Sequence, residues 1–165
     1  MAVDRTNILE QVLIAWRVHN NINLLLLKAV PAKGLLAVPS GSRGRDVARQ
    51  FAHMHKVRVN WLRYNGVAVG KMPTFAARTT PPRARLRKAL VNSGKEVEKF
   101  LRAKLEAGEP LRLFQGNPVR WMGYLISHES HHRGQIALAL KQNGMQLPGK
   151  ARGYHLWGKW VWGKG

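Results

Sequence analysis

Apolar residues recur at steps of three and four along most of the chain, which is the spacing of one face of an α-helix. Four stretches show this period, running from Asn7 to about Val30, from about Asp46 to about Tyr64, from Thr80 to Gly108, and from Asn117 to Gly144. Proline or glycine follows the first, third and fourth stretches, as expected where helices end. The third and fourth begin with a capping side chain followed by proline, a typical helix start. The pattern therefore predicts an all-α protein with four helices.

Three segments between or after these helices lack a helical period. Residues 33–44 are rich in Pro, Ser and Gly, as loops are. The connection from Gly66 to Thr80, between the second and third helices, is about fifteen residues long, and a loop of that length is often functional. The C-terminal tail, residues 145–165, is aromatic and basic, and we expect it to pack on the bundle rather than to stack on nucleic-acid bases. The length of 165 residues predicts a single domain over 1–165.

The chain is strongly basic, with 28 Lys and Arg against 8 Asp and Glu and a formal net charge of +20. Such a field attracts anionic small molecules, nucleic acid or an acidic membrane surface. The basic run in the third helix, Arg83, Arg85, Arg87 and Lys88, is the best candidate footprint for nucleic acid. Charge on an outer helix face is more often a solvated surface, and nothing in the sequence resembles a recognition helix.

The absence of cysteine excludes disulfides, thiolate nucleophiles and zinc sites built on sulfur. A metal site would therefore use histidine and carboxylate ligands. The apolar run Leu24 to Leu27 is far shorter than the ~20 residues that span a bilayer, so no membrane span is predicted. The first residues do not resemble a signal peptide, and we expect a cytoplasmic protein.

The most informative stretch is residues 125–136, inside the fourth helix. A projection at about 100° per residue places His128 and His132 on the core side with Leu125 and Ile136, and His131 on the exposed flank. Residues four apart lie one turn apart, so the neutral imidazoles of His128 and His132 can bind one divalent ion. The alternative is a pair of buried polar residues that satisfy each other and nearby carbonyls.

A third ligand from another helix has three candidates, which are His19, His53 and His55. The projection of the second helix does not choose cleanly between the last two and slightly prefers His55. Arg58 falls inside the apolar arc of the same helix, where its charge needs an acid or an anionic ligand. The alternative for Arg58 is a stem packed on the core with its head in water.

Residues 128–132 also spell H-E-x-x-H, the helix of zinc peptidases in which the glutamate is a general base. The rest of the chain argues against a peptidase. Glu129 is the last acid in the sequence, so no carboxylate ligand follows it, and the extended histidine motif fails because residues 135 and 138 are Gln and Leu.

The helix order, the run His128 to Ile136 and the run Phe51 to Met54 together resemble the DinB/YfiT-like family, which is distinct from the DNA polymerase of the same name. The resemblance spans nearly the whole chain, and the fourth-helix run is its most specific part. It implies an up-down-down-up four-helix bundle. It also implies a metal held by His53, His128 and His132, which overrules the slight preference of the projection for His55.

Known activities in that family are thiol S-transfer with bacillithiol or mycothiol and mycothiol-dependent isomerisation. The resemblance implies a metal-dependent S-transferase or hydrolase that acts on an unidentified small molecule. Its cofactor would be a divalent ion, with zinc and nickel as leading candidates, and a low-molecular-weight thiol could be co-substrate. The thiol or water would attack the substrate in a cleft shaped by the 66–80 connection and the tail.

The roles of Glu129 and Arg58 stay open at this point. Glu129 would be a general base or an acceptor that orients a ligand histidine, and we favour the second role. Arg58 would contact an anion. A homodimer is a candidate assembly. Two other functions compete with the enzyme, which are a basic nucleic-acid-binding protein and a metal-binding helical protein without catalysis.

Overall fold

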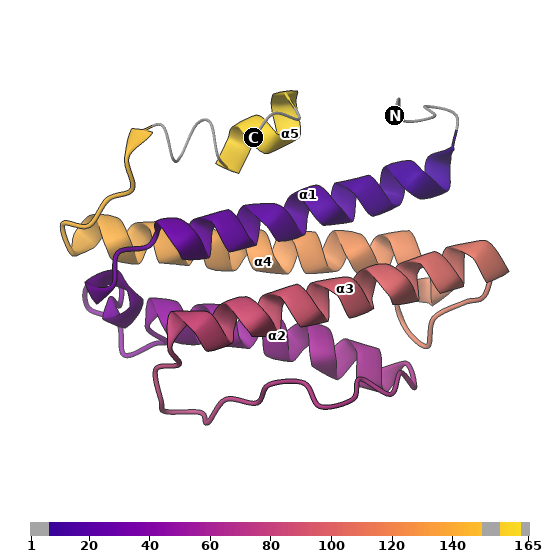
Figure 1. Ribbon diagram of the computed structural model, residues 1–165, viewed down its shortest axis with the longest axis horizontal. Coiled ribbons are helices and arrows are strands. Elements are labelled where there is room, and N and C mark those ends of the chain that lie inside the picture. The colour runs from indigo at the N-terminus through magenta and orange to yellow at the C-terminus, as the bar shows by residue number, and fades with distance from the viewer. Residues whose placement is uncertain (1–6, 150–155, 163–165) are drawn as a thin grey trace.

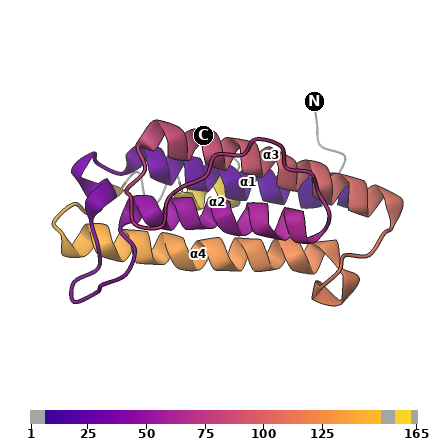
Figure 2. The ribbon, with the colours of Figure 1, turned by 90° about the horizontal axis from the view of Figure 1, so that it is seen from below.

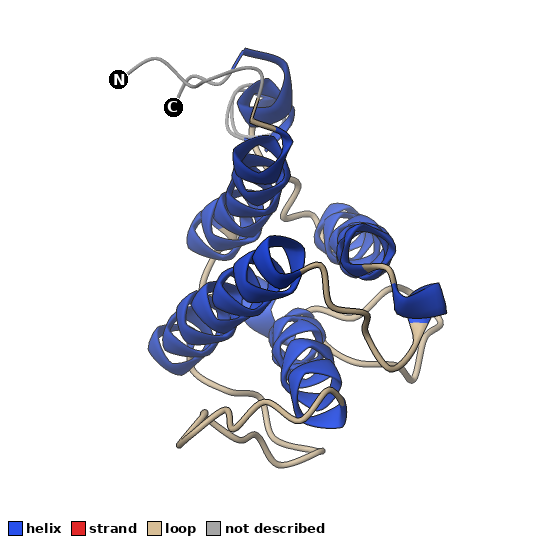
Figure 3. Cartoon of the chain, turned by 90° about the vertical axis from the view of Figure 1, so that its right-hand side faces the viewer, coloured by secondary structure: helices blue, strands red, loops and turns tan. Residues whose placement is uncertain are grey.

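The computed structural model describes residues 7–149 and 156–162, which contain helices and loops and no strand (Figures 1 and 3). The four long helices are α1 (Ile8–Ala29), α2 (Val47–Tyr64), α3 (Arg83–Ala107) and α4 (Pro118–Gln142). Three short helical segments had no counterpart in the sequence pattern, namely η1 (Lys33–Leu36), η2 (Phe114–Gly116) and α5 (Gly158–Trp162). The predicted all-α class with four long helices is confirmed.

The helices run up, down, down and up in chain order, as the family resemblance implied (Figure 1). Because α2 and α3 run in the same direction, the chain between them must return along the length of the bundle. It does so as an extended connection over the outside of α2 and α3 (Figure 2). No described helix is both long and apolar enough to cross a lipid bilayer.

Side chains at three helix starts supply the hydrogen-bond acceptors that the first turn needs. Asn7 caps α1, Asp46 caps α2 by accepting from the backbone N–H of Arg49 at 2.7 Å, and Asn117 caps α4. Gly108 ends α3 with a φ of 65°, a left-handed conformation that favours glycine. These ends agree with the sequence pattern to within one or two residues.

The prediction that Thr80 caps the start of α3 is wrong. Thr80 does not cap the helix, because Pro81 and Pro82 follow it and Pro82 occupies the N-cap position with extended backbone. A residue before proline is driven out of the helical region, which delays the helix to Arg83. The Thr80 hydroxyl instead donates to Asp46 Oδ2 at 2.7 Å, and this bond fastens the end of the long connection to the start of α2.

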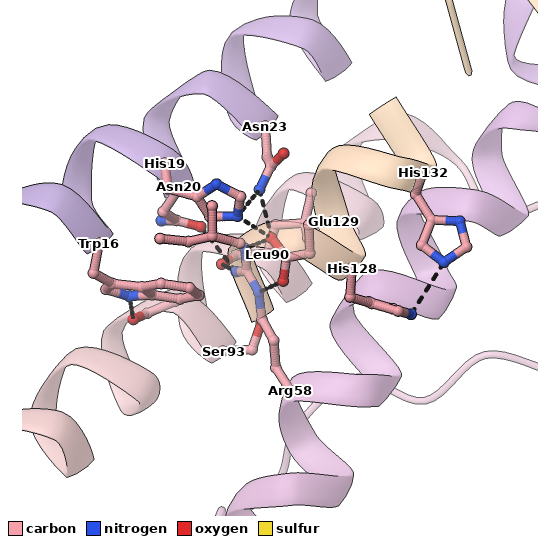
Figure 4. A network of polar contacts seen from close by, with 12 residues as sticks. Trp16, His19, Asn20, Asn23, Arg58, Leu90, Ser93, His128, Glu129 and His132 are labelled. Atoms are coloured by element: carbon pink, nitrogen blue, oxygen red, sulfur yellow. Dashed lines mark hydrogen bonds and ion pairs between the residues drawn. The ribbon is translucent and has the colours of Figure 1, made fainter. Parts of the chain in front are cut away.

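Two apolar clusters fill the bundle, and a buried polar layer lies between them. The first cluster includes Leu26, Phe51 and Ile136, and the second includes Trp16, Leu62 and Leu125. All four long helices contribute to the polar layer, whose members are His19, Asn20, Asn23, Arg58, Ser93 and Glu129 (Figure 4). α3 approaches α1 closely at this level, since an added Cβ at Gly94 would lie 2.5 Å from the Asn20 side chain.

The described part of the tail lies on the α1 side of the bundle. α5 lies against α1, and Leu156 packs on the first apolar cluster. Trp157 and Trp162 are exposed. The tail positions 150–155 and 163–165, also expected to pack on the bundle, lie outside the described residues.

Candidate metal centre

Three histidines from two helices come together beside the polar layer. His53 lies on α2, and His128 and His132 lie one turn apart on α4. One ring nitrogen from each lies within 4.8 Å of the other two. His132 is buried and the other two rings are half-buried, so the group is reachable from solvent on one side.

The spacing within this three-histidine group suits a metal ion. The Nε2 atoms of His128 and His132 are 3.2 Å apart. Two nitrogens at about 2.1 Å from one tetrahedral zinc ion lie about 3.4 Å from each other, so the α4 pair already has the separation of two ligands. The ring centroid of His53 is 4.9 Å from that of His132, close enough to supply the third nitrogen after a small side-chain movement.

The group is held in the protonation state that metal binding requires. Burial, with further repulsion from Arg45, lowers the pKa of His53 to about 4. Burial and the neighbouring rings lower the pKa of His132 to about 4, and burial also lowers the pKa of His128. All three imidazoles are therefore neutral at pH 7, and a neutral imidazole offers the lone pair that a metal accepts.

Gln50 orients one ring of the group. Its Oε1 atom accepts a short hydrogen bond from Nδ1 of His132, and Gln135 Oε1 lies 3.2 Å from the same nitrogen. The proton on Nδ1 leaves the lone pair on Nε2, the atom that faces His128. Acceptors of this kind, bonded to the far nitrogen of a ligand histidine, commonly fix the ring of a metal ligand. Sequence reasoning missed Gln50, although its position three residues before His53 on α2 was an available signal.

Replacing Gln50 with leucine, a side chain of similar size, is expected to weaken metal binding about 10- to 100-fold, the usual cost of losing such an acceptor. The same substitution at Gln135, whose oxygen is farther from His132, should have a smaller effect. Calorimetric titration of zinc or nickel into the metal-free proteins measures both changes. Equal affinities for the Gln50 variant and the wild type would show that Gln50 does not orient the ring.

The other candidate histidines have different neighbours. His55, which the helical projection slightly preferred, is buried against the long connection and its Nε2 donates to the carbonyl oxygen of Pro73 at 2.9 Å. His19 is buried in the polar layer. His131 is exposed, as its place on the helix predicted. The structure therefore brings together the set that the family resemblance implied, and not the one that the projection preferred.

Glu129 follows His128 in sequence but points in a different direction from α4, toward Arg58 and His19 (Figure 4). Its carboxylate accepts from Arg58 Nε at 2.6 Å, from His19 Nε2 at 2.7 Å and from Asn23 Nδ2 at 2.6 Å. Burial alone would raise the pKa of this carboxyl, but Arg58 and His19 outweigh burial and hold that pKa far below its ordinary value. None of its described bonds goes to a ring of the three-histidine group, so this geometry does not support the expected role of orienting a ligand.

Arg58 is fully buried, and its negatively charged partner is Glu129 of the same chain. The guanidinium makes two bonds to Glu129 and others to the Asn20 side chain and the Leu90 carbonyl, and it lies 4.9 Å from the centre of the Trp16 ring. The helical projection correctly placed this charge in the core. The structure does not support its expected contact with a bound anion, because the guanidinium already donates two hydrogen bonds to Glu129.

Aromatic side chains form one wall beside the group. Tyr124 stacks on His128 with ring centres 5.8 Å apart, and Phe114 and Trp61 surround Tyr124. Phe114 has a positive φ of 60°, a costly backbone conformation for a bulky residue. Sequence reasoning also missed Tyr124, which lies one turn before His128 on α4 and thus on the same face.

A family model described as the DinB family matches residues 1–158 of the chain. No curated protein matches it at a significant level. The match covers the whole of the four long helices, including every residue of the three-histidine group.

Proposed function

The chain belongs to the DinB family, and on that basis we propose that it is a metal-dependent enzyme that joins a thiol or water to a small electrophilic substrate. The proposed metal ligands are His53, His128 and His132. The observation that carries the proposal is the convergence of one ring nitrogen from each of them within 4.8 Å, on a half-buried face of the bundle.

The number of protein ligands favours catalysis over a purely structural metal. Structural zinc sites commonly use four protein ligands, whereas catalytic sites use three and keep a position open. A zinc or nickel ion bound here would supply a Lewis acid that activates a thiol or a water molecule as a nucleophile at neutral pH. Within the described residues the group contains no fourth histidine or carboxylate.

The residues around the group have distinct tasks in this proposal. Gln50 fixes the tautomer and the ring orientation of His132. Tyr124, which is itself partly exposed, and its aromatic neighbours cover one side of the group. Glu129 is not assigned as a general base, because both of its oxygens are bonded to other side chains. It is assigned instead to the polar layer that connects the helices.

The competing nucleic-acid-binding function loses part of its support. Two of the four cations in the basic run of α3 donate hydrogen bonds to backbone carbonyls of other segments of the chain. Arg83 donates to the backbone carbonyls of Leu27, Lys28 and Val30 at the end of α1, and Arg85 donates to the Thr74 carbonyl. Arg87 and Lys88 make no such bond among the described residues, and both are exposed, as Arg85 is too.

The enzyme proposal is tested by incubating metal-loaded protein with 1-chloro-2,4-dinitrobenzene and either cysteine or glutathione, and with p-nitrophenyl acetate in the absence of thiol. We expect saturable consumption of one electrophile that disappears in the His132→Ala variant. If wild-type protein holds metal but is no faster than this variant in every assay and in a wider screen of electrophiles, the metal-binding protein without catalysis becomes the better description.

A further inference from the structure

A cavity of about 490 Å³ lies between the outer face of α2 and the long connection that follows it. This volume is within the range of small-molecule sites, about 300–1,000 Å³. One wall comes from α2, and the other from residues 72–77 and 79 of the connection. Residues 43–45 contribute to the lining ahead of α2, and no residue of the described tail does.

The charged residues that line the cavity are all cations, namely Arg43, Arg45, Arg49, Lys56 and Arg63. No aspartate or glutamate lines it. Across residues 7–149 and 156–162, none of these five cations has a carboxylate within ion-pair distance. The chain thus gathers positive charge in a concave site, an arrangement that concentrates anions. Asp46, between Arg45 and the first turn of α2, does not line the cavity, and its carboxylate accepts from the Arg49 backbone N–H and the Thr80 hydroxyl.

One of these cations also has an unsatisfied buried donor. The Nε atom of Arg49 is buried and has no hydrogen-bond partner among the described residues. A buried donor without an acceptor is costly, and the cost is largest for a charged group. A carboxylate or phosphate oxygen is the acceptor that a guanidinium binds best.

The opposite wall is apolar and is held in place by hydrogen bonds. Phe75, Met72 and Pro73 face the cavity from the connection. His55 donates to the Pro73 carbonyl at 2.9 Å, and Arg85 donates to the Thr74 carbonyl at 3.2 Å and lies over the Phe75 ring. The connection therefore forms a preorganised wall that suits an apolar or aromatic body.

The cavity reaches the candidate metal centre through His53. This residue lines the cavity and is also a member of the three-histidine group. A molecule held by Arg49 and Lys56 can thus reach His53 within the cavity, whereas His128 and His132 do not line it.

We propose that the cavity binds an organic oxyanion, a small molecule that carries a phosphate or carboxylate group on an apolar body. Arg49 and Lys56 bind the anionic group, and Phe75 and Met72 contact the body. The identification of this molecule as a substrate rests on the proposed function, whereas its binding does not. The sequence showed only the excess of positive charge, and the fold places part of that charge in one cavity beside His53.

The test measures the affinity of phenyl phosphate, benzoate and phenol for the full-length protein by calorimetric titration. Phenol is the neutral match, and the two anions distinguish a preference for phosphate from one for carboxylate. Arg49→Gln and Lys56→Gln each remove one cavity cation. Lys95→Gln removes the same charge from an exposed position on α3 and serves as the matched control. His131→Ala, at an exposed histidine outside the three-histidine group, is a second control.

We expect at least one anion to bind more tightly than phenol and to lose about tenfold in affinity in Arg49→Gln and in Lys56→Gln, since each loses a charge-assisted bond. Lys95→Gln and His131→Ala should keep the wild-type affinity. Equal binding of phenol and both anions, or an equal loss in Lys95→Gln, would overturn the proposal. So would displacement of the anion by a short thymidine oligonucleotide that binds all variants alike, because the cations would then form a diffuse nucleic-acid surface.

The metal content of the same samples separates this inference from the proposed function. Wild-type protein that takes up metal but does not discriminate anions from phenol contradicts the cavity proposal alone. Protein that binds the anion through Arg49 and Lys56 but takes up no metal contradicts the enzyme proposal alone.

Discussion

Replacing His128 with alanine is expected to weaken metal binding by more than about 100-fold, beyond the cost of losing an orienting neighbour. The substitution leaves two imidazoles, His53 and His132, on different helices, and it removes the nitrogen that lies 3.2 Å from His132 Nε2. Elemental analysis of the purified variant should show close to no bound metal, where we expect about one ion per chain in the wild type. The half-buried position of His128 makes the fold tolerant of the smaller side chain.

Two histidines in the same helices provide matched controls. His131 is adjacent to His132 but exposed, and His55 is two residues from His53 but bonded to the Pro73 carbonyl. Alanine at either position should leave the metal content unchanged. A His128→Ala protein that retains a full equivalent of metal, or a His55→Ala protein that loses it, would refute the ligand set His53, His128 and His132.

The part of this site that lies within one helix could be predicted from the sequence. Residues four apart on a helix converge whatever the rest of the fold does, so spacing alone predicted that the rings of His128 and His132 lie together. Their partner on α2 could not be found in this way. A helical projection measures which side of a helix is buried, and both sides of α2 are covered, one by α4 and the other by the long connection. His55 faces the connection and His53 faces α4, so the family resemblance was needed to choose between them.

The same reason explains what sequence reasoning could not predict elsewhere. The place of Arg58 in the apolar arc correctly indicated a buried charge that needs an anion. Its partner Glu129 is 71 residues away, and no local pattern connects the two. The cavity also depends on the path of residues 66–82, which have no helical period and whose course is set by contacts with α2 and α3. Most helix ends, by contrast, were predicted well because caps such as Asn117 act over two or three residues; the start of α3, where two prolines follow Thr80, is the exception.

Arg58 and Glu129 form a fully buried ion pair, so the bundle is sensitive to the loss of either partner alone. Replacing Glu129 with leucine is expected to lower the free energy of unfolding by about 3–5 kcal/mol, because it leaves the Arg58 guanidinium buried without its counter-charge. Replacing Arg58 with methionine leaves the opposite uncompensated charge and should cost a similar amount. The double variant should recover most of the loss, since a buried ion pair replaced by apolar side chains of similar size is often neutral or stabilising. Urea denaturation followed by circular dichroism measures all three, with a chelator present so that metal binding does not contribute.

An exposed ion pair provides the control for these three variants of the buried pair. Arg17 and Glu98 form an ion pair of 2.8 Å, similar in length to the buried one, but both side chains are partly exposed. Leucine at Glu98 should cost no more than about 1 kcal/mol, because an exposed charge that loses its partner is solvated by water. If Glu129→Leu costs as little as Glu98→Leu, the polar layer is open to water and does not fix the helices. If the costs of the two buried single variants simply add in the double variant, Arg58 and Glu129 act independently, and the layer would then stabilise the bundle through its other bonds, those of His19 and Asn23.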